Sequence, residues 1–173
     1  MTMTRKGLIQ FSGKDVTVVG PDILVGQTAP EFTAHAPDFS TVNALESTQG
    51  KVRIIGSLPS LNTSVCDRET RKFNEEAANL SSDIAIIMVS TDLPYAQRSW
   101  CAAAGIDRVI TLSDHVDTMF GERYGVLMQE PRVLRRAIFV VDRHDQVVYA
   151  AYMPAIGVEP DYQQVLQAAK AAL

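Results

Sequence analysis

Three short segments that are apolar along almost their whole length limit the fold of this chain most strongly. They are residues 52–57 (VRIIGS), 83–90 (DIAIIMVS) and 137–142 (AIFVVD). A half-buried strand alternates apolar and polar residues, whereas a strand whose sheet is covered on both faces does not. Segments of mixed polar and apolar residues lie between them and fit covering helices. We therefore predict an α/β fold in which a central sheet lies between two outer layers.

The order of the elements narrows the topology. Residues 8–11 and 16–19 flank the turn-forming stretch Ser12–Asp15, which predicts an N-terminal β-hairpin. Residues 143–145 join two strands by a connection too short for a parallel crossover, so the central sheet must be mixed. Further strands are predicted at 108–112 and 146–153, helices at 64–80, 94–105, around 115–125 and at 160–173, and irregular chain at 20–50. This order outlines a thioredoxin-like fold, a central mixed β-sheet flanked by helices.

Length, charge and hydropathy exclude several classes of protein. With 46% apolar residues, the 173-residue chain fits a single domain, 1–173, whose residues 1–6 are expected to be flexible. The net charge of −4 and the scattered basic residues argue against a nucleic-acid partner. The longest apolar run, residues 84–89, is too short to span a membrane, and no apolar signal-peptide core follows the first residues. We expect a cytoplasmic protein, in which a disulfide would be transient and catalytic.

One of the two cysteines, Cys66, lies where the predicted helix 64–80 begins. The free N–H groups and the positive dipole end of a helix start stabilise an anion, and the pKa of thiols at such positions can fall to about 3.5 to 7.5. Thr63 adds a hydroxyl, and Pro59 adds a rigid wall that lacks an N–H donor. The alternative is an inert cysteine in the core, because free cysteines are often buried.

Spacing excludes two other kinds of cysteine chemistry. Cys66 and Cys101 lie far apart in the sequence, and the three histidines show no paired ligand spacing, which argues against a metal site. The chain contains no Cys-x-x-Cys, so an ordinary thioredoxin or disulfide-isomerase mechanism is excluded as well.

Residues 59–66 (PSLNTSVC) resemble the P-x-x-x-T-x-x-C loop of the peroxiredoxins. Residues 69–77 (ETRKFNEEA) and 90–101 (STDLPYAQRSWC) are similar to segments of the bacterial thiol peroxidases, the atypical branch with both cysteines in one chain. The similarity extends from about Gly7 to Leu173. The loop alone is moderately specific, but its combination with a D-L-P-[FY]-A-Q pattern that ends in a cysteine is highly specific.

The resemblance implies a thiol-specific peroxidase for antioxidant defence, which reduces hydrogen peroxide and organic hydroperoxides to water and alcohols. It assigns Cys66 as the peroxidatic cysteine and Cys101 as the resolving cysteine, joined by a disulfide during the cycle. Thr63 would bond the thiolate and the peroxide, Pro59 would shield the pocket, and Arg136 would stabilise the thiolate. The implied reductant is thioredoxin and the implied assembly is a homodimer, with no cofactor or metal.

Two departures from the family pattern bear on these assignments. Asn62 stands where an aspartate is expected, and the segment 126–135 is shorter than usual, which leaves Arg132 and Arg135 as alternatives to Arg136. Because side chains alternate across a sheet, Arg135 is expected to face away from the side that Arg136 faces.

The surroundings of the two cysteines lead to further expectations. Six charged residues are predicted to form the outer face of helix 64–80: Arg68, Glu69, Arg71, Lys72, Glu75 and Glu76. Alternatively, Arg71 orients Arg136 or the peroxide. Cys101 lies about two turns inside its helix and Cys66 at the start of another, so we expect the chain around both to refold locally when a disulfide forms.

Two other functions are compatible with the same fold. A redox-sensing protein would use the Cys66–Cys101 disulfide as a signal, and a structural module would carry inert thiols, with Cys101 packed beside Trp100. Thr63 and Arg136 favour the enzyme, because a bare redox switch does not need residues that activate a peroxide.

Overall fold

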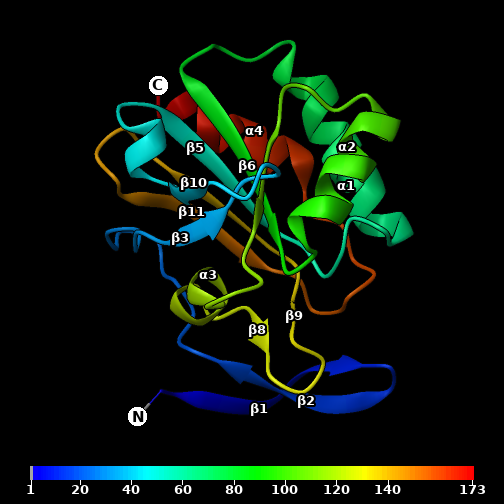
Figure 1. Cartoon of the computed structure of the whole chain (residues 1–173). Coiled ribbons are helices and arrows are strands. Elements are labelled where there is room, and N and C mark those ends of the chain that lie inside the picture. Colours follow the sequence, from blue (N-terminus) through cyan, green and yellow to red (C-terminus); the bar gives the residue numbers. More distant parts are fainter. Residues whose placement is uncertain (1) are drawn as a thin grey trace.

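The computed structural model describes residues 2–173, and its centre is a seven-stranded sheet in the order β11-β10-β5-β6-β7-β3-β4 (Figure 1). Three strands are parallel to one another: β5 (Val52–Ser57), β6 (Ile84–Ser90) and β7 (Ile110–Ser113). The antiparallel strands are β10 (Ala137–Val141) and β11 (Val147–Tyr152) on one side and β3 (Thr33–His35) and β4 (Thr41–Asn43) on the other. The predicted mixed sheet of a thioredoxin-like fold is confirmed.

Three helices cover one face of this sheet: α1 (Ser64–Ala77), α2 (Pro94–Ala104) and α4 (Tyr162–Ala171) (Figure 1). Ile54 of β5 and Ile138 of β10 belong to the core that also contains Phe73 of α1. Pro94 is the first residue of α2, and Gly105 ends it with φ = 66°, the left-handed conformation that glycine adopts readily. These two residues start and stop the helix where the sequence predicted.

The opposite face carries the short helices α3 (Met119–Arg123) and η1 (Glu46–Thr48). Ile55 and Phe139 follow Ile54 and Ile138 in sequence but belong to the core on this side, where the rings of Phe32 and Phe120 pack with their centroids 4.7 Å apart. Successive side chains of a strand point to opposite faces, so each central strand is buried on both sides. This explains why these strands show no alternation in the sequence.

A second sheet of four strands lies at the end of the molecule that holds the N-terminus (Figure 1). Its order is β1-β2-β8-β9, formed by β1 (Thr4–Phe11), β2 (Lys14–Val19), β8 (Leu127–Met128) and β9 (Val133–Leu134). The predicted hairpin is confirmed, and its turn residues Ser12 and Gly13 both have positive φ. Residues 4–6, which were expected to be flexible, instead begin β1 and pair with residues 17–19. Residue 1 lies outside the described residues.

The remaining differences from prediction concern short elements. Residues 20–50 contain β3, β4 and η1, and residues 126–135 contain β8 and β9. Each has only two or three residues, too few to show a periodic pattern. α3 occupies residues 119–123 of the helical segment that was predicted around 115–125. Within residues 2–173, every helix is too short or too polar to cross a membrane.

Candidate active site

Cys66 lies in the first turn of α1, as predicted, and its side chain is fully buried. Thr63 is the N-cap residue: its backbone is extended, and its hydroxyl oxygen accepts a bond from the Cys66 amide over 3.4 Å. The Thr63 hydroxyl donates in turn to the Ser60 carbonyl at 3.1 Å. This cap starts the helix so that the sulfur lies near the positive end of the helix dipole. Pro59 is buried between β5 and this turn.

Arg136 contacts the Cys66 sulfur directly. It precedes β10 and lies two residues before Ile138, so strand alternation points it toward the face that α1 covers. Its Nη2 lies 3.2 Å from Cys66 Sγ, and its Nε and Nη2 donate to the Ile156 carbonyl at 3.3 and 3.1 Å. The guanidinium is 1% exposed. A buried cation thus lies beside the sulfur, where it stabilises a thiolate.

The two alternative arginines point elsewhere. Arg135 faces the opposite side, as alternation predicted: its Nε donates to the Gly125 carbonyl at 2.9 Å, and it pairs with Asp22. Its guanidinium also lies over the Tyr152 ring, 4.1 Å from the centroid. Arg132 donates to the Thr118 hydroxyl at 3.3 Å. The shortened segment therefore leaves Arg136 as the arginine beside Cys66.

Glu69, which was predicted to lie on the outer face of its helix, is fully buried and forms an ion pair with Arg136 Nη1. The prediction was wrong because residues three apart share a helix face, so a residue at this distance from the buried Cys66 turns inward too. That spacing is the signal that should have located it. Burial raises the pKa of Glu69 to about 7, although Arg136 acts in the opposite direction.

The other charged residues of α1 have exposed or half-buried side chains, as predicted. Arg71 pairs with Asp67 at 2.9 Å, lies over the Trp100 ring at 5.6 Å and donates to the Ala104 carbonyl at 3.2 Å. The alternative that Arg71 orients Arg136 is therefore wrong. Trp100 Nε1 also donates to Asp67 at 3.1 Å, so these side chains tie α2 to α1 rather than contribute to the sulfur site.

Cys101 lies in the second half of α2 and is half-buried. Its sulfur is 3.6 Å from the Thr111 hydroxyl, and burial raises the pKa of its thiol, partly offset by Thr111. Both cysteines are free thiols in this form of the protein. Cys101 faces β7, whereas Cys66 lies in the core between α1 and Arg136, so the structure holds the two thiols in separate surroundings.

Asp92 links the two segments that carry the cysteines. Its carboxylate accepts bonds from the Ser60 hydroxyl at 2.7 Å, the Leu61 amide at 2.8 Å and the Ser90 hydroxyl at 2.8 Å. Ser60 and Leu61 belong to the loop before Cys66, and Asp92 lies two residues before α2. One carboxylate thus fixes the loop of one cysteine against the start of the helix of the other.

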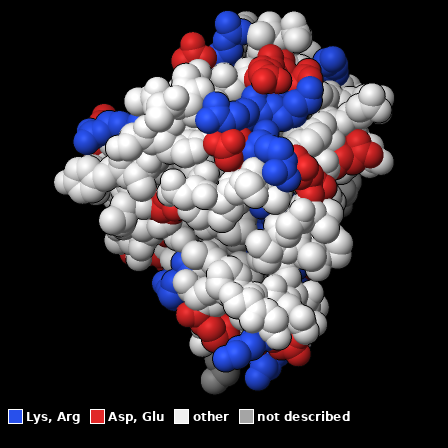
Figure 2. Space-filling view, turned by 90° about the vertical axis from the view of Figure 1, so that its right-hand side faces the viewer, with Lys and Arg blue, Asp and Glu red and all other residues white. Residues whose placement is uncertain are grey.

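The surface at the loop before α1 carries a shallow pocket of about 440 Å³, whose lining does not include the buried Cys66. Its lining comes from the loop and the two neighbouring helices and includes Thr63, Asp67 and Trp100. Figure 2 shows this side of the molecule, where basic and acidic side chains are interleaved. Within residues 2–173, no group of three or more His, Cys, Asp or Glu side chains is arranged to hold a metal ion.

Comparison with known proteins gives consistent matches over most of the chain. The profile of the Redoxin family matches residues 24–166. The thiol peroxidase of Halalkalibacterium halodurans is 49% identical over 95% of this chain and 98% of its own length. That of Bacillus subtilis (strain 168) is 47% identical over 94% of this chain and 96% of its own length.

Solved structures agree with these sequence matches. The peroxiredoxin-like protein from Aquifex aeolicus is 34% identical, with a TM-score of 0.85 over 99% of both chains. The thiol peroxidase from Chromobacterium violaceum, at 22% identity, has a TM-score of 0.81 over 94% of this chain and 95% of its own, a likeness of fold alone.

Proposed function

Since the chain belongs to the Redoxin family and, within it, to the bacterial thiol peroxidases, we propose that Cys66 is its peroxidatic cysteine and that Arg136 holds the reacting sulfur as a thiolate. The protein is a thiol-dependent peroxidase with an antioxidant function. The observation that carries the assignment is the contact of 3.2 Å between Arg136 Nη2 and Cys66 Sγ at the start of α1.

In the first step the Cys66 thiolate attacks one oxygen of a peroxide. The S–O bond forms, the O–O bond breaks, and the leaving oxygen takes up a proton and departs as water or an alcohol. Negative charge grows on that oxygen, where the Arg136 guanidinium and the N–H groups of the first turn of α1 stabilise it. Thr63, which caps the turn that carries the sulfur and lines the neighbouring surface pocket, is placed to bond the peroxide in this cycle, and the buried Pro59 shields the site. The sulfur is left as a sulfenic acid.

In the second step the Cys101 thiol attacks the sulfenic sulfur, releases water and forms the Cys66–Cys101 disulfide. A disulfide requires Cα atoms within about 7 Å, so the start of α1 and the part of α2 around Cys101 must move. Thioredoxin then supplies the dithiol that reduces the disulfide, with no metal or cofactor in the cycle. Structures of the reduced and oxidised forms test the movement: superimposable backbones at both cysteines would contradict it.

The experiment that tests the assignment follows peroxide loss with thioredoxin recycling. Cys66→Ser is expected to abolish peroxide reduction. Cys101→Ser is expected to consume one equivalent of peroxide per chain and then stop, because its sulfenic acid lacks a partner thiol. A redox sensor would form the same disulfide but turn over slowly with every peroxide. Equal activity in all three proteins would exclude the proposed cycle.

We also propose that the protein is a cytoplasmic homodimer. Several apolar side chains are exposed together near the start of α2, among them Phe39 and Tyr95, whose rings are 4.6 Å apart. An exposed apolar patch of this kind favours association with a second copy. Tyr95→Asp is expected to shift the protein toward the monomer in sedimentation equilibrium; an unchanged mass would exclude this face.

A further inference from the structure

One buried guanidinium serves two acidic groups in this site. Arg136 donates through Nη2 to the Cys66 sulfur at 3.2 Å and through Nη1 to Glu69, and all three side chains are at most 1% exposed. If both acids were ionised, two negative charges would share one positive charge in a medium that screens them poorly. The three groups are electrically neutral only when one proton is retained between Cys66 and Glu69.

The environment of Glu69 shows where such a proton can be held. Its Oε2 contacts Arg136, but its Oε1 accepts no bond from any residue of the described chain and is buried. A buried carboxylate oxygen without a donor is costly, whereas a protonated carboxyl carries no charge to solvate. Burial, with a smaller contribution from Glu159, raises the pKa of Glu69 to about 7 despite Arg136.

Few other charged groups face Glu69. Glu159, in the chain before α4, is held by Arg68 at 3.5 Å and accepts a bond from the Tyr162 hydroxyl of α4 at 2.8 Å. Within residues 2–173, Arg136 is the only cation that forms an ion pair with Glu69. The charge on Glu69 is therefore balanced by the same guanidinium that serves the sulfur.

We propose that Glu69 is a positioning residue that shares one proton with Cys66 through Arg136 and so sets the fraction of thiolate available for reaction. With the proton on Glu69, the guanidinium balances the thiolate and the site is ready to react. With the proton on Cys66, the guanidinium is paired with the carboxylate and the site is idle. When this proton is lost to solvent, the Cys66 thiolate and the Glu69 carboxylate share the single positive charge of Arg136. The inference rests on the proposed role of Cys66.

Two variants of Glu69, one carboxamide and one apolar, separate the effect of its charge from the effect of its contact with Arg136. Glu69→Gln keeps an oxygen for Arg136 Nη1 but removes the negative charge, and the two bonds from Arg136 to Ile156 remain. Glu69→Ala removes the contact itself and frees one side of the guanidinium. Glu75→Gln is the matched control, because it makes the same change of charge on an exposed residue of the same helix.

The first measurement follows the thiolate absorbance of Cys66 against pH in proteins that also carry Cys101→Ser. Glu69→Gln is expected to lower the midpoint by about one pH unit or more and to replace a broad, two-step titration by a single step. Glu75→Gln is expected to leave the curve unchanged. For peroxide reduction near pH 6, Glu69→Gln is expected to retain or exceed the native rate, whereas Glu69→Ala loses it.

The second measurement does not depend on a Glu69 variant that folds. The carboxyl carbon of Glu69 is followed by ¹³C NMR in the native protein and in Cys66→Ser. Coupling is reciprocal, so loss of the sulfur charge must lower the pKa of Glu69 by about the same amount as Glu69→Gln lowers that of the thiol. The proposal would be overturned if Glu69→Gln left the titration of Cys66 unchanged and Cys66→Ser left the titration of Glu69 unchanged. A Cys66 thiol that stays neutral to pH 9 in every variant would instead contradict the proposed function.

Discussion

Arg53 and Arg136, both buried, lie at opposite ends of the β5–β10 strand pair and on opposite faces of the central sheet. Arg53 pairs with Val141 at the last residue of β10, whereas Arg136 precedes Ala137, which pairs with Ser57 at the last residue of β5. Strand alternation places Arg53 on the side of Ile55 and Arg136 on the side that α1 covers.

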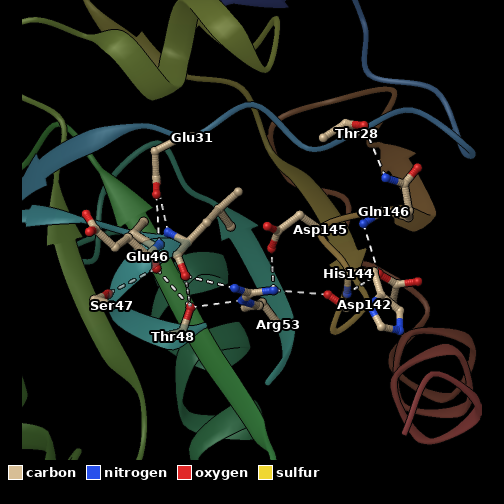
Figure 3. Close-up of polar contacts among 12 residues, drawn as sticks. Thr28, Glu31, Glu46, Ser47, Thr48, Arg53, Asp142, His144, Asp145 and Gln146 are labelled. Atoms are coloured by element: carbon tan, nitrogen blue, oxygen red, sulfur yellow. Dashed lines mark hydrogen bonds and ion pairs between the residues drawn. The ribbon is translucent and has the colours of Figure 1, made fainter. Parts of the chain in front are cut away.

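The partners of Arg53 are almost all fixed dipoles (Figure 3). Its Nη2 donates to the Leu45 carbonyl at 2.8 Å, its Nε to the Thr48 hydroxyl at 3.0 Å, and its Nη1 to the Asp142 carbonyl at 3.0 Å. Its one acidic partner, Asp145 at 2.7 Å, is 45% exposed. Arg53 thus joins β5 to two neighbouring segments by bonds that no proton transfer between buried groups can alter.

Arg136 differs in the chemistry of its partners rather than in its burial. Two of its contacts are acids with buried side chains, Cys66 and Glu69, and only Ile156 supplies a carbonyl. In this protein, the buried arginine whose acceptors are neutral or solvated stabilises the fold, whereas the one shared by two buried acids is placed to take part in chemistry. Variants at both positions test this contrast.

The largest effect is expected from Arg136→Gln. It removes the cation that stabilises the thiolate and the leaving oxygen, so the second-order rate of peroxide reduction should fall by about 10² to 10³. Stopped-flow kinetics measures it. Arg132→Gln is the control, because Arg132 contacts Thr118 instead of the sulfur. If the rate fell equally in the two variants, Arg136 would have no specific role in the reaction.

The second variant, Arg53→Met, is expected to act on stability instead. The carbonyls of Leu45 and Asp142 lose their donor, and the free energy of unfolding should fall by about 2 to 6 kcal/mol, because each buried carbonyl left without a donor costs about 1 to 3 kcal/mol. Urea denaturation measures it, and the folded fraction should keep the native rate with peroxide. If this variant does not fold, Thr48→Val tests the same cluster at about 1 kcal/mol. If folded Arg53→Met reacted with peroxide more slowly than the native protein, Arg53 would not be purely structural, and the contrast with Arg136 would fail.

The third prediction concerns pH. The pKa of Glu69 in the folded protein is about 7, above the value of about 4.3 for an unfolded chain, so the folded state binds more protons between these values. In Cys66→Ser, where no thiolate forms beside Arg136, the free energy of unfolding should therefore fall as the pH rises from 4.5 to 7.5, by up to about 3 kcal/mol. Asp114, whose pKa burial raises to about 6, contributes in the same direction.

Urea denaturation at these two pH values, in Cys66→Ser and in Cys66→Ser combined with Glu69→Gln, isolates the contribution of Glu69. The fall in the free energy of unfolding should be smaller in the double variant, where Asp114 still contributes. If Cys66→Ser instead becomes more stable over this range, Glu69 is already ionised in its folded state at pH 4.5.

The smallest effect is expected from Asp145→Asn. Asp145 has φ = 62°, a conformation that asparagine also tolerates, and its amide oxygen can still accept from Arg53. Because the carboxylate is 45% exposed, the loss of its charge should cost about 1 kcal/mol or less, without a change in peroxidase rate. A loss as large as that of Arg53→Met would mean that the ion pair, rather than the carbonyl acceptors, holds this cluster.

The sequence predicted the mixed sheet and the start of α1 because both have strong local causes. Double-sided burial leaves continuous apolar strands, and Thr63 caps its helix through its own side chain. Alternation also predicted that Arg135 and Arg136 diverge. The two-residue strands β8 and β9 were missed because they are too short to show a periodic pattern and because β8 is held in its sheet by β2, which is distant in sequence.

Glu69 was missed for a different reason. A charged residue among other charged residues was assigned to the solvated face, although its spacing from Cys66 indicated burial. Asp92 lies within the family-like segment 90–101, but only the folded chain brings it to Ser60 and Leu61. Residues whose partners lie in a distant segment of the chain can be identified only from the tertiary structure.

The junction of the two sheets restricts where related chains can tolerate an insertion or a deletion. β9 ends at Leu134 and β10 begins at Ala137, with two consecutive arginines between them that point to opposite sides. Deletion or insertion of one residue here would exchange their directions and present the wrong guanidinium to the sulfur. The turn at 129–132 lies outside this constraint. Gaps among related chains should therefore accumulate in that turn and be purged from residues 134–137.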